Sequence, residues 1–99
     1  MRDGVYVVRV IGDLDMATAP TLEERFASVG SASRLVIDLT QCAFLDSAAV
    51  RLLTTIARDS NTAGTPLALV ASDPGILRVL EITAVDDILP VHSTLDDAL

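Results

Sequence analysis

The sequence predicts a single α/β domain whose sheet is mostly parallel. Short segments rich in Val, Leu and Ile alternate with longer segments in which apolar residues recur at helical spacing. Strands that alternate with helices of this length favour crossover connections, and crossovers join parallel strands. The chain of 99 residues has room for one core, so residues 1–99 are expected to form one domain. In so short a chain, helices are expected mainly on one face of the sheet.

The first half of the chain predicts two strands and one helix. A β-branched run ends at Gly12, and Pro20 suits the first turn of a helix. The run 35–39 is apolar on both faces, which is typical of a buried strand. The expected elements are a strand at 6–11, a turn at 12–15, a helix from Thr18 or Ala19 to Gly30 and Ser31, a strand at 35–39 and a loop at 40–46.

The second half predicts two more strands and three helices. Asp73 followed by Pro74 is a typical helix start, and Pro90 favours an edge position for the last strand. The expected elements are a helix at 47–59, a strand at 66–71, a short helix from Asp73 to Ile82, a strand at 88–91 and a last helix capped by Ser93.

Composition excludes several classes of partner. The formal net charge is −7, and all seven basic residues are Arg. Binding to a nucleic-acid backbone or to anionic lipid requires positive charge, so neither is expected. An acidic domain of this kind favours a neutral or basic protein surface as its partner. The single Cys42 lies in an apolar stretch and is expected to be a small buried side chain.

Nothing in the sequence predicts export or membrane insertion. No apolar run reaches 18 residues, and the first residues lack the basic and then apolar pattern of a secretory signal. One cysteine cannot form an internal disulfide. A cytoplasmic location is therefore expected, without direct insertion into a membrane.

Catalytic and metal sites are also not expected. One Cys and one His are too few for a structural zinc site, and phosphate-binding glycine motifs are absent. Ser47 lacks the glycine-flanked turn of a nucleophile that would act with His92. Asp38 lies at the end of a predicted central strand, as in phospho-receiver domains, but the chain has no Lys for that chemistry. We expect no enzyme, no cofactor and no metal.

The stretch 44–50, Phe-Leu-Asp-Ser-Ala-Ala-Val, carries the strongest functional signal. Asp46 or Ser47 is expected to cap the helix that begins there. The Ser47 hydroxyl is either such a cap or an acceptor for a phosphoryl group. Free N–H groups and partial positive charge at a helix start tolerate an anion, while the neighbouring Asp46 and Asp15 across the loop would oppose it. Both readings stay open on the residues alone.

These residues resemble the STAS domain and, more narrowly, the bacterial anti-sigma factor antagonists. The resemblance covers nearly the whole chain and is most specific at the Phe-Leu-Asp-Ser junction. The segments that carry it are Gly-Asp-Leu-Asp at 12–15, Thr18 with Ala19, the apolar run 35–39, the junction 44–47 and the run 74–80. It implies a mixed sheet of four to five strands and about four helices, mainly on one face.

The resemblance also implies a partner-switching role in the regulation of transcription. The unphosphorylated antagonist would bind an anti-sigma factor that is also a serine kinase, and thereby free a sigma factor. The kinase would phosphorylate Ser47, and a phosphatase would reset it. By position, Asp15, Thr18 and Asp46 would form the neighbourhood of the phosphosite. Candidate partner contacts are Ala48, Ala49, Arg51 and Leu52.

The chain departs from the family pattern in two places. Ala48-Ala49-Val50 stands where the family commonly has Ser/Thr-Gly-Leu, so the Ala49 methyl is expected where a kinase backbone would approach. The first edge strand is short or missing before Val5, which leaves an edge that could pair with a second copy as a homodimer. The alternatives are a subunit of a lipid-transport ABC complex and a scaffold subunit of a stress-signalling assembly.

Overall fold

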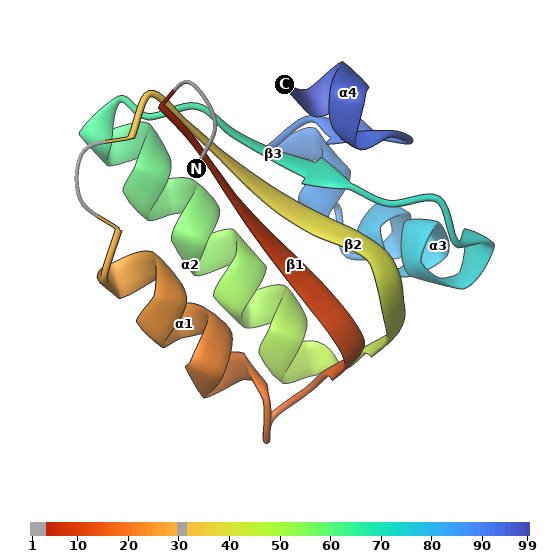
Figure 1. Ribbon diagram of the computed structural model, residues 1–99. Helices are drawn as coiled ribbons and strands as arrows, with labels where there is room; N and C mark the ends of the chain where they lie inside the picture. The colour runs from red at the N-terminus through yellow and green to blue at the C-terminus, as the bar shows by residue number, and fades with distance from the viewer. Residues whose placement is uncertain (1–3, 30–31) are drawn as a thin grey trace.

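A computed structural model describes residues 4–29 and 32–99 and confirms one α/β domain around a single sheet (Figure 1). In this part of the chain the sheet has four strands in the order β1-β2-β3-β4, and every neighbouring pair is parallel. The mixed sheet that the resemblance implied is therefore all parallel here. The elements are β1 Val5–Leu14, α1 Ala19–Ala27, β2 Arg34–Leu45, α2 Ser47–Ala63, β3 Leu67–Val70, α3 Pro74–Ile82, the 3-10 turn η1 Val85–Asp87, β4 Val91–His92 and α4 Leu95–Ala98.

The two long strands β1 and β2 extend well beyond the predicted runs. The turn predicted at 12–15 and the loop predicted at 40–46 were wrong over residues 12–14 and 40–45, which are strand. Along the pair, Arg9 faces Asp38, Ile11 faces Gln41 and Asp13 faces Phe44. The register thus advances by one residue at two places, so β2 contains two extra residues, each of which forms a β-bulge. The side chains of β1 still alternate between the two faces of the sheet.

Helices cover the two faces of the sheet unequally. Figure 1 shows α1 and α2 side by side on one face, with α4 on the other. The main core lies on the α1–α2 face and includes Leu14, Ile37, Leu39, Leu53, Leu69 and Leu80. A small second core on the opposite face joins Val36, Ala68 and Val70 to Ala98 of α4. The expectation of helices mainly on one face is confirmed.

Sequence signals at the helix ends are partly confirmed. Asp73 caps α3, and its carboxylate accepts a hydrogen bond from the Ile76 backbone N–H at 3.0 Å. The cap of α4 is Thr94 instead of the predicted Ser93, with Thr94 Oγ1 accepting from the Asp97 N–H at 3.2 Å. Helix α2 runs four residues past the predicted end and stops at Gly64, whose φ of 75° suits a glycine.

Two other boundaries differ from expectation. Helix α1 ends at Ala27, and the predicted stop at Gly30 and Ser31 lies outside the described residues. Strand β4 has only two residues, Val91 and His92, but it lies at the edge of the sheet as Pro90 predicted. No helix among the described residues combines the length and apolar character needed to span a bilayer.

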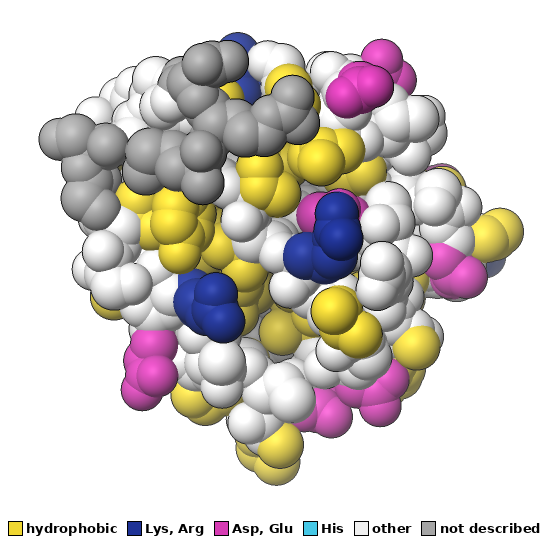
Figure 2. Space-filling view, in the orientation of Figure 1, with side chains coloured by type: hydrophobic (Ala, Val, Ile, Leu, Met, Phe, Trp, Pro, Cys, Tyr) yellow, Lys and Arg dark blue, Asp and Glu magenta, His cyan; other side chains and the backbone are white. Residues whose placement is uncertain are grey.

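A buried carboxylate lies on the sheet face that α1 and α2 leave open. The Asp38 side chain is 3% exposed and its Oδ2 accepts from Arg9 Nε at 3.2 Å. Its Oδ1 accepts from the Thr40 hydroxyl at 2.6 Å and from the Thr40 N–H at 2.9 Å. Figure 2, from the side of β1, shows basic side chains near the middle of this view among hydrophobic ones. The network satisfies a carboxylate that burial would otherwise make costly.

Cys42 is buried, as predicted. It is 4% exposed, and its thiol donates to the Phe44 carbonyl at 3.3 Å. Burial raises the pKa of this thiol above its ordinary value. The side chain therefore contributes to the core as a neutral thiol.

Candidate functional site

Ser47 is the first residue of α2 and follows directly on the end of β2. The last strand residue, Leu45, is buried in the main core, and Asp46 turns the chain into the helix. Ser47 itself is exposed. Its side chain makes no hydrogen bond to the described part of the chain. A free hydroxyl is thus presented at a helix N-terminus, where amide groups and the helix dipole favour negative charge.

Asp46, and not Ser47, caps the helix. Asp46 Oδ1 accepts a hydrogen bond from the Ala49 N–H at 2.9 Å, which is the usual geometry of an N-cap. The Ala49 N–H also contributes most to holding the pKa of Asp46 below its ordinary value; desolvation opposes it, and the Met16 N–H adds to it. The open choice between Asp46 and Ser47 as cap is thereby resolved in favour of Asp46.

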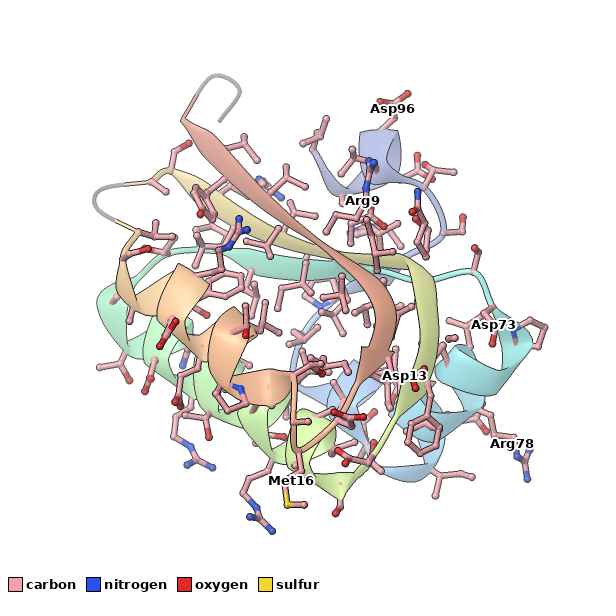
Figure 3. All side chains as sticks on the ribbon, turned by 60° about the horizontal axis from the view of Figure 1, so that its bottom comes forward. Arg9, Asp13, Met16, Asp73, Arg78 and Asp96 are labelled. Carbon is pink, nitrogen blue, oxygen red and sulfur yellow. The ribbon has the colours of Figure 1, made fainter. Side chains whose placement is uncertain are left out.

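The same carboxylate ties the loop between β1 and α1 to the start of α2. Asp46 Oδ2 accepts from the Met16 backbone N–H at 2.9 Å, across 30 positions of sequence. The Asp46 backbone N–H donates to the Leu14 carbonyl at 3.3 Å. Figure 3 shows Met16 at the tip of this loop, pointing away from the sheet. One side chain thus connects the two segments that the sequence predicted to meet at the phosphosite.

Asp15 and Thr18 hold that loop in its shape. Asp15 Oδ1 accepts from the N–H groups of Ala17 at 2.9 Å and Thr18 at 3.1 Å. Thr18 Oγ1 accepts from the Asp15 N–H at 2.9 Å and donates to the Asp13 carbonyl at 2.9 Å. Thr18 occupies the N-cap position of α1, but its hydroxyl is used in this turn and makes no cap bond. Asp15 and Thr18 therefore fix the backbone of the loop that lies beside Asp46.

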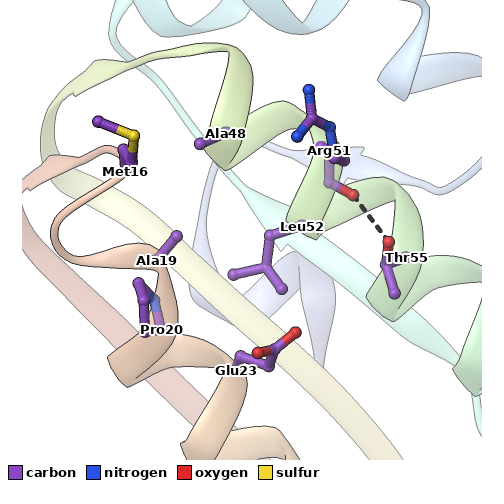
Figure 4. A pocket seen from close by; sticks show the side chains of 8 residues that line it. All are labelled: Met16, Ala19, Pro20, Glu23, Ala48, Arg51, Leu52 and Thr55. Atoms are coloured by element: carbon purple, nitrogen blue, oxygen red, sulfur yellow. Dashed lines mark hydrogen bonds between the residues drawn. The ribbon is translucent and has the colours of Figure 1, made fainter.

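A groove of about 250 Å³ lies between the starts of α1 and α2, and one of its lining residues is Ala48, which directly follows Ser47 in the chain (Figure 4). Met16, which is 77% exposed, forms one wall, and Arg51 and Thr55 of α2 form the other. The Thr55 hydroxyl donates to the Arg51 carbonyl at 3.0 Å, so it is held along the helix. The complete lining is Met16, Ala19, Pro20, Glu23, Ala48, Arg51, Leu52 and Thr55.

The structure separates the four predicted contact residues on α2. Ala48 is half-buried and Arg51 is exposed, and both line the groove. Leu52 is 7% exposed and belongs to the main core, although part of it lines the groove. Ala49 is 0% exposed and packs in the core, so the expectation that its methyl lies where a partner approaches was wrong.

Two large exposed side chains near Ser47 were not predicted as contacts. Met16 lies in the loop that Asp46 holds, and Phe44, which is 52% exposed, lies three residues before Ser47. The only sequence signal for an exposed apolar surface near Ser47 was Met16, a large apolar residue that directly follows the predicted turn.

The other sequence alternatives receive no support from the described residues. Asp38 is buried and paired with Arg9, and is thus unavailable as a phosphoryl acceptor. In the described ranges no group of three or more His, Cys, Asp or Glu side chains could hold a metal ion. Asp38 and Cys42 are both buried, whereas the Ser47 hydroxyl is exposed and within reach of a partner.

Comparison with known proteins agrees with this geometry. The family profile of the STAS domain matches residues 1–98. The anti-sigma-F factor antagonists RsfB and RsfA of Mycobacterium tuberculosis are 32% and 27% identical over 102 residues. These alignments cover 99% of this chain and 81% and 80% of the two relatives.

Solved structures resemble the chain over its whole length. An anti-sigma factor antagonist from Mycobacterium paratuberculosis is 36% identical with a TM-score of 0.87, covering 99% of this chain and 85% of the other. A sulfate transporter family protein from Wolinella succinogenes has a TM-score of 0.89 at 16% identity, covering 100% and 84%, so it shares the fold alone. From its profile match, its relatives and its fold, this chain belongs to the STAS domain family.

Proposed function

We propose that this chain is an anti-sigma factor antagonist: it binds an anti-sigma factor that is also a serine kinase, and it is released when Ser47 is phosphorylated. The exposed hydroxyl at the start of α2 carries the proposal. The names of the Mycobacterium relatives support an anti-sigma factor as the partner. The protein would act in the cytoplasm, and a separate phosphatase would reset it.

In the proposed reaction Ser47 is a substrate and the kinase supplies the chemistry. Ser47 Oγ attacks the γ-phosphorus of ATP held by the kinase, and the bond from that phosphorus to the bridging oxygen of ADP breaks. A base of the kinase takes the hydroxyl proton. The reaction adds about −1.5 to −2 charges at the start of α2. The free N–H groups of the first helical turn can accept this charge, so the fold should survive.

Release of the partner would follow from charge at the docking surface. The phosphate would lie next to Asp46, whose lowered pKa keeps it ionised at neutral pH. It would also lie beside the groove formed by Met16, Ala48 and Arg51, which we assign as the contact surface of the anti-sigma factor. A dianion at the rim of a docked surface would lose part of its hydration, which costs free energy unless the partner offers a matching cation. Binding would then be lost without unfolding.

Intact-mass analysis tests the site directly. The purified chain is incubated with ATP and candidate anti-sigma factor kinases, and the product is mapped by peptide sequencing. We expect one added phosphoryl group on the native chain and none on Ser47→Ala. The matched control is Ser72→Ala, which removes another exposed serine and should be phosphorylated like the native chain.

The outcome separates the alternatives. Full phosphorylation of Ser47→Ala would reject Ser47 as the acceptor. If the kinase binds the phosphorylated and the unphosphorylated chain equally tightly, the charge switch is rejected. Failure to bind any anti-sigma factor, together with co-purification with a permease and its ATPase, would favour the transport-complex alternative.

A further inference from the structure

Helix α2 carries two exposed arginines at different distances from Ser47. Arg51 lies four residues after Ser47, and Arg58 lies eleven residues after it. Residues four apart on a helix are neighbours on its surface, with Cβ atoms about 5–6 Å apart, whereas eleven residues span about 16 Å of the helix axis. Long side chains on a helix also lean toward its N-terminus. Arg51 is therefore placed to reach a group attached to the Ser47 oxygen, and Arg58 is too far away.

Arg51 has no ionic partner in the described part of the chain. The ion pair found there joins Arg9 to Asp38. Glu23 lines the same groove from α1, but Figure 4 shows the Arg51 guanidinium directed away from it. The exposed guanidinium is thus available to an anion.

The backbone donors at the start of α2 are already partly used. The Ala49 N–H donates to Asp46 Oδ1 at 2.9 Å, and the Val50 N–H donates to the Asp46 carbonyl at 3.1 Å. At most the N–H groups of Ser47 and Ala48 remain for a phosphate on Ser47, and a phosphate has three strong acceptor oxygens. The adjacent Asp46 carboxylate adds a like charge. A phosphate at this position therefore needs a cation as well as the helix start.

We propose that Arg51 is the counter-ion of a phosphate on Ser47, and that this pairing withdraws Arg51 from the groove between the starts of α1 and α2. The inference rests on the proposed phosphorylation of Ser47. An anion four residues before a cation is the favourable order on a helix. A guanidinium binds phosphate oxygens through two parallel N–H bonds, so the pair forms within one helix and needs no change of fold.

The pairing changes the charge of the groove. Among the described residues that line it, one side chain is basic and one is acidic, Arg51 and Glu23. Before phosphorylation, Arg51 can contact an acidic group of the anti-sigma factor. After phosphorylation the guanidinium is held at the phosphate, and the groove keeps only the charge of Glu23. The partner and the phosphate thus compete for one guanidinium, which couples phosphorylation to release.

A chain with phosphoserine inserted at position 47 during translation tests the pairing without any kinase. The probe is the side-chain Nε–H signal of each arginine in nuclear magnetic resonance, and Arg51→Gln identifies the Arg51 signal by its loss. We expect this signal to move, and its exchange with water to slow, when position 47 carries phosphate. Arg58, on the same helix, is the matched control and should not change. An unmoved Arg51 signal, or equal movement at Arg51 and Arg58, would overturn the proposal.

The pKa of the phosphate provides a second measurement, by phosphorus resonance at low salt, where exposed charges are screened least. The second pKa of phosphoserine is ordinarily about 6. It should lie about 0.3 higher in Arg51→Gln than in the native phosphorylated chain, because a nearby cation favours the dianion. Arg58→Gln leaves Arg51 and the neighbouring Asp46 in place and should titrate like the native chain. Equal pKa values in the native chain and Arg51→Gln would reject the pairing.

Affinity for the anti-sigma factor tests the consequence for binding. Arg51→Gln should weaken binding of the unphosphorylated chain about threefold, and phosphoserine should then cost about threefold less affinity than it costs the native chain. Equal losses on phosphorylation with and without Arg51 would reject the competition for its guanidinium. Phosphorylation and release by the kinase, in a chain whose Arg51 signal does not move, would remove this inference and leave the proposed function intact. A chain that no kinase phosphorylates, but whose inserted phosphate pairs with Arg51, would do the opposite.

Discussion

Replacing Arg9 with glutamine is expected to lower the free energy of unfolding by about 1–2 kcal/mol at neutral pH. The change keeps most of the aliphatic stem and removes the charge that Asp38 faces at 3.2 Å. Asp38 is 3% exposed, so its carboxylate keeps the two bonds from Thr40 but loses its only cationic partner among the described residues.

The size of this effect lies between two limits. Breaking a fully buried ion pair costs about 3–5 kcal/mol, while an exposed pair contributes about 0.2–1 kcal/mol. Arg9 is 49% exposed and partly screened by water, which places the pair between these limits. Urea denaturation followed by circular dichroism measures the difference. A double-mutant cycle with Asp38→Asn should give a coupling energy of about 1 kcal/mol.

The effect of Arg9→Gln should also depend on pH. Burial alone would raise the pKa of Asp38, but the hydrogen bonds from Thr40 and then the charge of Arg9 outweigh it and hold the pKa below the ordinary 3.8. A carboxyl group with a lowered pKa stabilises the fold above its unfolded pKa and loses that contribution as pH falls through the folded pKa. The difference between native chain and variant should therefore shrink below about pH 3.8. An equal difference at pH 7 and in acid would refute the argument.

Two further substitutions test the candidate site. Asp46→Ala should lower the melting temperature and detach the loop at Met16, because it removes the acceptor of two backbone N–H groups, whereas Asp46→Asn should retain most of the cap. Amide hydrogen exchange at Met16 and Ala49 measures both effects, and unchanged protection in Asp46→Ala would contradict the assignment. Met16→Ala should weaken binding of the anti-sigma factor about tenfold with little change in stability, as measured by calorimetry. Ile82→Ala, at an exposed residue of α3, is the control and should bind like the native chain.

Sequence patterns predicted the elements well where the core-facing residues follow one period. They failed over residues 40–45, because the two bulges make Leu39, Cys42 and Leu45 face the core at a spacing of three. That spacing matches neither the period of two of a strand nor a sustained helical stripe, so the segment resembled a loop. Gly12 had a similar effect in β1, since a glycine with a φ of 86° is a turn signal in sequence.

The sequence predicted which residues belong to the site, but it did not predict the hydrogen bonds and packing that connect them. The carboxyl ends of neighbouring parallel strands meet at one edge of a sheet, so the residues after β1 and after β2 could be expected to lie together. The bond from Asp46 to the Met16 N–H joins a side chain to a backbone group, and nothing in residue type marks it. Burial of Ala49 depends on the exact rotation of α2, which overlapping apolar stripes leave undetermined.

The double use of Asp46 makes the amide of Met16 a natural spectroscopic probe. An amide proton that points at a carboxylate has a resonance position sensitive to the charge and orientation of that group, and Ser47 lies next to it in the chain. In a titration followed by nuclear magnetic resonance, binding or phosphorylation at the start of α2 should therefore shift the amide signal of Met16. This residue lies in the loop after β1, thirty positions before Asp46 in the sequence.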